Sequence, residues 1–145
     1  MYVELHTRSA FTFLEGGSIP EELIDVCAKL GMKSMAMLDR DGVYGSARFH
    51  LAAEKLGLRA HIGAEISYSP QRHRDTEKNR NKTSEPLWSS GELFHVPLIC
   101  RTRTGYQNLC RLVTRMKARG PKNCDPAITA ASVDDLREFS EGFIC

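Results

Sequence analysis

Short apolar segments alternate with amphipathic ones along the first half of the chain. Residues 34–38 are apolar almost throughout, which is typical of a parallel strand covered on both faces. Between residues 18 and 31, apolar side chains recur at helical spacing, at Leu23, Ile24, Cys27 and Leu30. Further segments predict strands ending at residues 6 and 62 and a second helix over residues 43–56. This order of strand and helix predicts consecutive parallel units, as in an α/β barrel or a doubly wound sheet.

Regular structure is predicted again in the second half. Residues 93–100 form a strand pattern, in which Pro97 indicates an edge position or a bulge. A helix follows with its apolar face at Leu109, Leu112, Val113 and Met116. Three pairs have the spacing of helix N-terminal capping boxes: Ser18 with Glu21, Thr104 with Gln107, and Ser132 with Asp135.

The pattern divides the chain into three parts. Residues 1–68 hold the strand and helix units, residues 69–91 have no apolar periodicity and predict a mobile surface loop, and residues 92–145 resume regular structure. The last four residues look like the start of another parallel strand, which has no helix after it to cover it. We therefore expect the chain to be a fragment of a longer product.

Composition fits one globular domain, since 41% of the 145 residues are hydrophobic. No apolar run has the length of a membrane span, and no basic and apolar leader opens the chain, so a cytoplasmic protein is expected. The five cysteines are an odd number without any C-x-x-C pair, which argues against a disulfide framework and against a thiolate zinc site.

Basic residues are concentrated in two places. Residues 101–124 carry seven basic side chains and no acidic one, and residues 71–82 carry five basic and two acidic ones. A solvated helix face would explain residues 101–124, and a disordered loop would explain residues 71–82. The alternative is that these segments contact nucleic acid or an acidic partner. The candidate contacts are Arg72, Arg74, Lys78, Arg80, Arg111 and Arg115.

Three side chains that bind metals or protons follow three predicted strands. His6, Asp39 and Glu65 each stand at or just beyond the carboxyl end of a strand. In parallel α/β folds these ends meet at one rim, so the three side chains are expected to converge. Arg8 and Arg40 stand beside them, and a guanidinium stays protonated and has no lone pair with which to bind a metal.

An ordered set of motifs resembles the PHP (polymerase and histidinol phosphatase) family. These are His6-x-Arg8, Glu15, Asp39-Arg40 with Asp41-Gly42-Val43-Tyr44-Gly45, Ile62-Gly63-Ala64-Glu65, and Gly105-Tyr106-Gln107-Asn108-Leu109. They look most like the N-terminal PHP domain of bacterial DNA polymerase III alpha subunits, in particular the error-prone branch. The resemblance implies a distorted (β/α)7 barrel of mostly parallel strands, here truncated after about its first half. It also implies DNA replication or repair synthesis by the parent chain, without the polymerase's catalytic aspartates in these residues.

Members of the family with an intact site bind divalent metals such as zinc, manganese or magnesium and hydrolyse phosphoesters, in some cases as 3′-5′ exonucleases. The ligand positions carried over by the resemblance are His6, Glu15, Asp39, Glu65 and His95. Arg8 and Arg40 occupy two family histidine positions. We expect these arginines to neutralise the carboxylates in place of metal, with phosphate or DNA-backbone binding as the alternative. The partners that the resemblance implies are the rest of the polymerase chain and DNA through that chain. A barrel cut after four or five strands would expose an unpaired edge and apolar faces, so a second copy of the fragment is a further expected partner.

Overall fold

Five strands form one sheet in the computed structural model, which describes residues 2–69, 93–121, 124 and 126–145. They are β1 (Glu4–Thr7), β2 (Ser34–Arg40), β3 (Arg59–Tyr68), β4 (Phe94–Cys100) and β5 (Phe143–Ile144), and they lie side by side in that order. Strands β1, β2 and β3 pair in parallel, β4 is antiparallel to β3, and β5 is antiparallel to β4. All strands except β4 therefore point the same way, which confirms the predicted α/β fold of mostly parallel strands.

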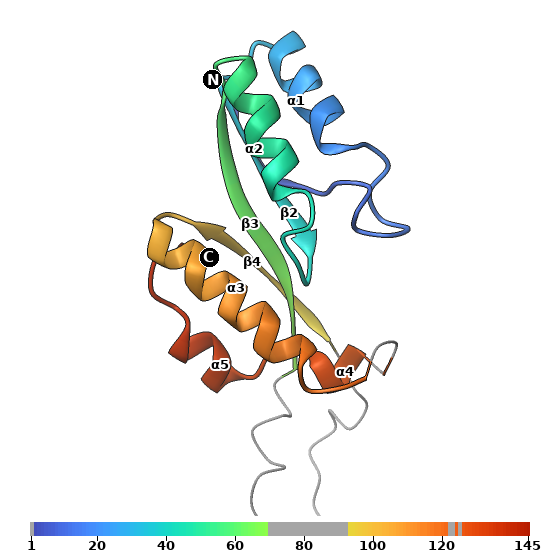
Figure 1. The fold of residues 1–145 in the computed structure, drawn as a ribbon, viewed down its shortest axis with the longest axis vertical. Coiled ribbons are helices and arrows are strands. Elements are labelled where there is room, and N and C mark those ends of the chain that lie inside the picture. The colour runs from blue at the N-terminus through green and yellow to red at the C-terminus, as the bar shows by residue number, and fades with distance from the viewer. Residues whose placement is uncertain (1, 70–92, 122–123, 125) are drawn as a thin grey trace, which may run out of the picture.

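The helices lie toward two ends of the sheet (Figure 1). Helices α1 (Pro20–Lys29) and α2 (Ser46–Lys55) lie toward one end, and α3 (Arg103–Lys117), α4 (Pro126–Thr129) and α5 (Val133–Glu138) lie toward the other. Gly31 and Gly57, both with φ of +67°, follow the ends of α1 and α2, where the left-handed conformation suits glycine. No helix in the described part of the chain is long and apolar enough to cross a membrane.

Two apolar clusters hold the helices on the sheet. The first joins α1 and α2 to β2, and its buried members are Ile24, Cys27, Met32, Met35, Met37, Phe49 and Ala53. The second joins α3 and the C-terminal segment to β3 and β4, and its buried members are Ala64, Ile66, Leu98, Leu109, Leu112, Met116, Ala131 and Phe139. Successive side chains of a strand point to opposite faces, so residues 60, 62, 64 and 66 face these clusters while Glu65 faces the other way.

Two helix starts differ from the capping boxes that the sequence predicts. Helix α1 begins after Ile19, whose backbone N–H donates to the Glu22 carboxylate at 3.2 Å, and not after Ser18. Helix α3 begins after Thr102, which caps the helix with its side chain, and not after Thr104. The N-cap is the last residue with an extended backbone before the helix, so a nearby pair with the right spacing predicts it only approximately.

Strand β3 is longer than the sequence predicts. The apolar pattern ends at residue 62 and leaves Glu65 beyond the strand, but in the structure Glu65 lies inside β3 and pairs with Pro97 of β4. Strand β5 pairs only with Ile99 and Cys100. In the described part of the chain, Pro97 therefore has a neighbouring strand on one side only, where its missing N–H is tolerated, in agreement with the predicted edge position.

Candidate functional site

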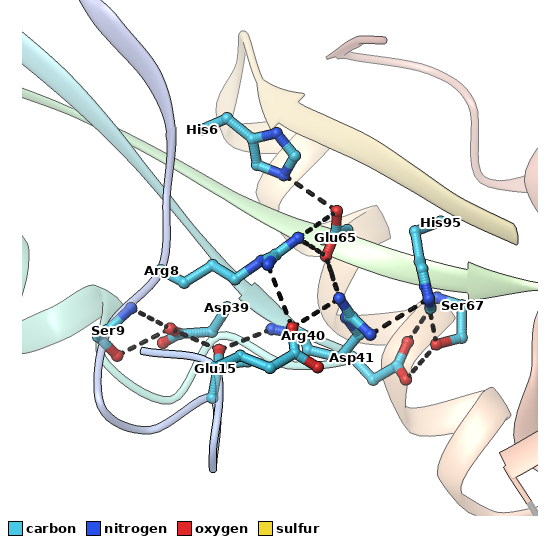
Figure 2. Close-up of polar contacts among 11 residues, drawn as sticks. His6, Arg8, Ser9, Glu15, Asp39, Arg40, Asp41, Glu65, Ser67 and His95 are labelled. Carbon is cyan, nitrogen blue, oxygen red and sulfur yellow. Dashed lines mark hydrogen bonds and ion pairs between the residues drawn. The ribbon is translucent and has the colours of Figure 1, made fainter. Parts of the chain in front are cut away.

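Glu65 is the centre of a network of ion pairs on the sheet face opposite the helices. The parallel register of β2 and β3 sets Arg40 directly beside Glu65, whose side chain is only 5% exposed. Arg8, just after β1, places its Nη2 2.9 Å from Glu65 Oε1 and 2.7 Å from Oε2. Arg40 donates to Glu65 Oε2 from Nε at 3.0 Å, and its Nη2 lies 2.9 Å from the same oxygen. Both carboxylate oxygens of Glu65 are thus engaged by guanidinium groups (Figure 2).

Glu15 closes this network into a ring. Its Oε2 lies 3.1 Å from Arg8 Nη1 and 2.7 Å from Arg40 Nη2. Each of the two carboxylates therefore contacts both guanidinium groups, and two positive charges balance two negative ones. Because Glu15 is 36% exposed and Glu65 is buried, the ring runs from the solvent-facing loop after β1 to the interior of the sheet.

Opposing effects act on the pKa of Glu65. Burial favours the neutral carboxyl and raises the pKa, whereas the hydrogen bonds and charges of Arg8 and Arg40 favour the carboxylate and lower it. The arginines prevail, and the pKa of Glu65 lies below its ordinary value of 4.5. Glu65 is therefore an anion at neutral pH, and its charge is compensated by side chains of this chain alone.

Two histidines lie at the edge of the ring. His6 Nε2 lies 3.0 Å from Glu65 Oε1, and His95 Nε2 lies 3.2 Å from Arg40 Nη1 (Figure 2). A guanidinium can only donate, so His95 accepts through Nε2, and its ring proton is on Nδ1, which lies 3.5 Å from Ser67 Oγ. In this arrangement the lone pair of His95 is directed at Arg40.

Asp39 has a different place from the other predicted ligands. Its Oδ1 accepts hydrogen bonds from Ser9 N at 2.9 Å, Ser9 Oγ at 2.7 Å and Thr12 Oγ1 at 3.1 Å, and its Oδ2 accepts from Gly45 N at 3.1 Å. The side chain is buried, and these four donors tie the loop after β1 and the start of α2 to the end of β2. Sequence reasoning missed Ser9, Thr12 and Gly45 as its partners, because the bonds depend on the path of two loops.

Asp41 is a second anchor, half-buried, whose contacts the sequence did not indicate. It stands just after β2 with φ of +49°, and its two carboxylate oxygens accept from Ser67 N and Ser67 Oγ, each at 2.7 Å. This contact fixes the loop after β2 against the far end of β3. It lies next to His95 and so helps to place that side chain beside Arg40.

The side chains present do not fit a divalent-metal cluster. Both oxygens of Glu65 already accept from guanidinium groups, and Asp39 accepts four hydrogen bonds from other donors. Across residues 2–69 and the described part of 93–145, no group of three His, Cys, Asp or Glu side chains is arranged to hold a metal ion. Two fixed positive charges at the same place would also repel a cation.

The predicted nucleic-acid contacts separate in the structure. Arg72, Arg74, Lys78 and Arg80 lie outside the described residues. Arg111 is exposed on α3, whereas Arg115 is half-buried, stacks over the Phe139 ring at 4.5 Å and pairs with Glu138 at 2.8 Å. The basic run of residues 101–124 is therefore not one uniform surface.

A comparison with family models decides the family. The PHP domain model matches residues 4–145, which is almost the whole chain. The chain belongs to the PHP domain family. This confirms the resemblance to the PHP family that the strand-end motifs carry.

Several curated relatives of this PHP domain are error-prone DNA polymerases. The relative from Mycolicibacterium paratuberculosis is 34% identical over 97% of this chain, and that from Anaeromyxobacter sp. (strain K) is 37% identical over 79% of it. The relative from Nocardia farcinica is 47% identical over 46% of the chain. The aligned part spans 12%, 9% and 6% of these three proteins. The PHP domain described here is thus homologous to a small region of much longer error-prone polymerases.

One solved structure shares the fold of the PHP domain. It is a protein from Bifidobacterium adolescentis, assigned as a metal-dependent phosphoesterase, with a TM-score of 0.51 and 20% sequence identity. The match covers 81% of this chain and 32% of that protein. At this identity the likeness concerns the fold, and it supports the α/β arrangement of the sheet and its helices.

Proposed function

We propose that this chain is a structural PHP module of an error-prone DNA polymerase, with a metal site rebuilt as an internal ion-pair ring. In this proposal the parent chain carries out DNA replication or repair synthesis in the cytoplasm, and the rest of that chain is the main partner of the module. The module itself does not polymerise DNA and has little or no phosphoesterase activity. The support comes from the polymerase relatives and from the ring of Arg8, Arg40, Glu15 and Glu65.

The ring is the main support for the proposal because its arginines can fulfil the structural role of a metal ion. A metal ion in such a place would hold together carboxylates from different elements and offset their mutual repulsion. Arg8 and Arg40 provide the same two effects, since each contacts both Glu15 and Glu65 at 2.7 to 3.1 Å. A guanidinium cannot activate water as a Lewis acid does, so the chemistry of a metal site is not reproduced.

The competing function is a metal-dependent phosphoesterase or 3′-5′ exonuclease. The observation in its favour is that His6 and Glu65, two of the predicted ligands, are in contact at 3.0 Å, with His95 attached to the same network through Arg40. In that case zinc, manganese or magnesium would have to displace Arg8 and Arg40 from the carboxylates. The two functions make opposite predictions about metal content.

Elemental analysis of protein purified without chelator tests the proposal. We expect less than about one tenth of an equivalent of zinc or manganese, and no hydrolysis of bis-p-nitrophenyl phosphate or of a 3′-labelled oligonucleotide above the rate of a heat-inactivated sample. One equivalent of metal that is lost in His6→Ala and kept in His50→Ala would overturn it. His50 is the matched control because it is an exposed histidine on α2, outside the ring.

The isolated chain is also proposed to associate with a second copy. Strand β1 is the outer strand of the described sheet, and Leu5 within it is 49% exposed, so this edge is open to pairing with another strand. Light scattering between about 5 and 200 μM tests this. A mass that rises with concentration is expected, and a constant monomer mass would refute it.

A further inference from the structure

Five basic side chains on α3 and in the turn after it divide into an inner pair and an outer stripe. The inner pair is Arg115 and Arg119, which are half-buried and bound to α5: Arg119 contacts Asp135, and Arg115 contacts Glu138. The outer stripe, defined here as Arg103, Arg111 and Lys117, is exposed. In the described part of the chain, none of these three makes an ion pair. The acidic side chains of α5 thus neutralise the inner pair and leave the stripe as free positive charge.

The stripe follows one face of α3 along its whole length. Its residues lie on the side away from the buried Leu109, Leu112 and Met116, and Figure 1 shows α3 along the surface of the molecule. At about 1.5 Å per residue, the 14 steps from Arg103 to Lys117 span about 21 Å. The same face also presents exposed neutral donors, which are Tyr106, Gln107 and Thr114.

The positive charge at the start of α3 does not stabilise the helix. The first turn of α3 has no acidic residue and begins with Arg103, whose positive charge is unfavourable beside the positive end of the helix dipole. By contrast, α1 and α5 both have two acidic residues in their first turns. Helix α3 contains no acidic residue, so no pair of opposite charges within the helix offsets its cations.

We propose that the outer stripe of α3 binds the phosphate backbone of nucleic acid. A row of cations about 21 Å long matches a line of about six phosphates, since the phosphates of one duplex strand recur every ~3.4 Å along the axis. Exposed hydroxyl and amide donors between the cations suit phosphate and sugar oxygens, which take most protein contacts to DNA. The stripe has no large aliphatic side chain among the residues named above, so an apolar protein interface is not favoured.

This proposal is separate from the ring of Arg8, Arg40, Glu15 and Glu65. The ring arginines are neutralised by carboxylates and lie beside β1 to β3, whereas the stripe is on α3 and makes no ion pair with any residue that the structure describes. Loss of DNA binding would therefore leave the structural role of the ring untouched. Finding a metal in the ring would likewise leave the stripe unaffected.

Fluorescence anisotropy with a labelled 20-nucleotide DNA, single-stranded and as a duplex, tests the stripe over 25 to 200 mM KCl. The native chain is expected to bind at low salt, with log affinity falling linearly against log salt concentration. The triple variant carries Arg103→Gln, Arg111→Gln and Lys117→Gln. Its slope of log affinity for the duplex against log salt concentration should become shallower by about 2 to 3, because each lost phosphate contact removes about 0.9 from the slope. Affinity at 25 mM KCl should fall at least tenfold. Circular dichroism checks that the variant is folded, and single Arg111→Gln should shrink the slope by about 1.

The matched control removes three exposed cations elsewhere, in Lys29→Gln, Lys55→Gln and Arg59→Gln, with the same change of net charge. It should retain at least half of the native affinity. Equal loss in both triple variants would show that only overall charge matters and would overturn the proposal. No binding by the native chain at 25 mM KCl would overturn it too, as would binding to polyglutamate that exceeds binding to DNA.

Discussion

Arg8 contacts Glu65 through both carboxylate oxygens, with its Nη2 2.9 Å from Oε1 and 2.7 Å from Oε2, although 57 residues separate the two in sequence. The contact joins the loop after β1 to the interior of β3. Glu65 is 5% exposed, so its negative charge is costly unless a cation stays beside it. The network therefore stabilises the fold mainly by preventing an uncompensated buried charge at Glu65, and the number of its ion pairs is less important.

Removal of Arg40 should destabilise the fold clearly. Arg40→Ala leaves the buried Glu65 carboxylate with fewer donors and releases Glu15 and His95 from their contacts. We expect a loss of about 2 to 3 kcal/mol in the free energy of unfolding, below the range for fully buried pairs because Arg40 is 24% exposed. Urea unfolding followed by circular dichroism measures it.

Arg48→Ala is the control for that variant. Arg48 also forms two short hydrogen bonds to one carboxylate, that of Glu21, but both side chains are at least 40% exposed. Its removal should cost less than about 1 kcal/mol, as for other surface pairs. Equal losses of unfolding free energy in the two variants would show that the ring stabilises the fold no more than a surface ion pair does.

Acid should remove the contribution of Glu65 to the stability of the fold in a defined pH range. Burial alone would raise the pKa of this carboxyl, but the arginines lower it below 4.5, so the ionised form is favoured more in the folded state than in the unfolded state. Its stabilising effect is therefore fully present above about pH 4.5 and is lost as pH falls through the lower pKa of the folded state. Asp135 on α5 acts in the same direction, because Arg119 and Ser132 overcome the effect of burial on its pKa.

The variant Glu65→Gln isolates this effect. At pH 7 it should be less stable than the native chain, and the difference in unfolding free energy should shrink steadily below pH 4.5, as native Glu65 takes up a proton. Urea unfolding at intervals of half a pH unit from 7 to 3 gives the curve. A difference that is constant over the whole range would refute a lowered pKa for Glu65.

Asp39 is expected to stabilise the fold independently of any metal. In Asp39→Asn the amide nitrogen cannot accept a hydrogen bond, so at least one of the four donors from Ser9, Thr12 and Gly45 loses its acceptor in a buried place. The expected loss is about 1 to 3 kcal/mol in unfolding free energy. The same value should be found with EDTA and with added zinc. A loss that appears only with zinc would instead identify Asp39 as a ligand.

The sequence predicted the elements well because local patterns determine them. The apolar run of β2, the helical spacing of α1 and α3, and the capping box of Ser132 with Asp135 all have their predicted roles in the structure. The caps at Ser18 and Thr104 were wrong, since several polar residues near a helix start compete for one position. The antiparallel direction of β4 depends on how the chain returns to the sheet, which no local pattern indicates.

The site could be predicted only in part. Strand-end placement and the family motifs pointed to His6, Arg8, Glu15, Arg40, Glu65 and His95, and the structure brings these side chains into one network. The partners of Asp39 and Asp41 were missed, because backbone N–H groups and hydroxyls from folded loops leave no signal in the sequence. Arg115 was grouped with Arg111 by composition alone, whereas its contact with Glu138 depends on the packing of α5 against α3.

The most direct test of the central claim measures unfolding free energy with zinc and with EDTA for the native chain and for the double variant Arg8→His and Arg40→His. The ring is proposed to take the place of a metal, so the native chain should have the same stability, within about 0.5 kcal/mol, in both conditions. The variant should be at least about 2 kcal/mol less stable in EDTA and should recover with zinc, because neutral imidazoles can bind the cation that the guanidinium groups exclude. Native protein that loses stability in EDTA and regains it with zinc would contradict the account.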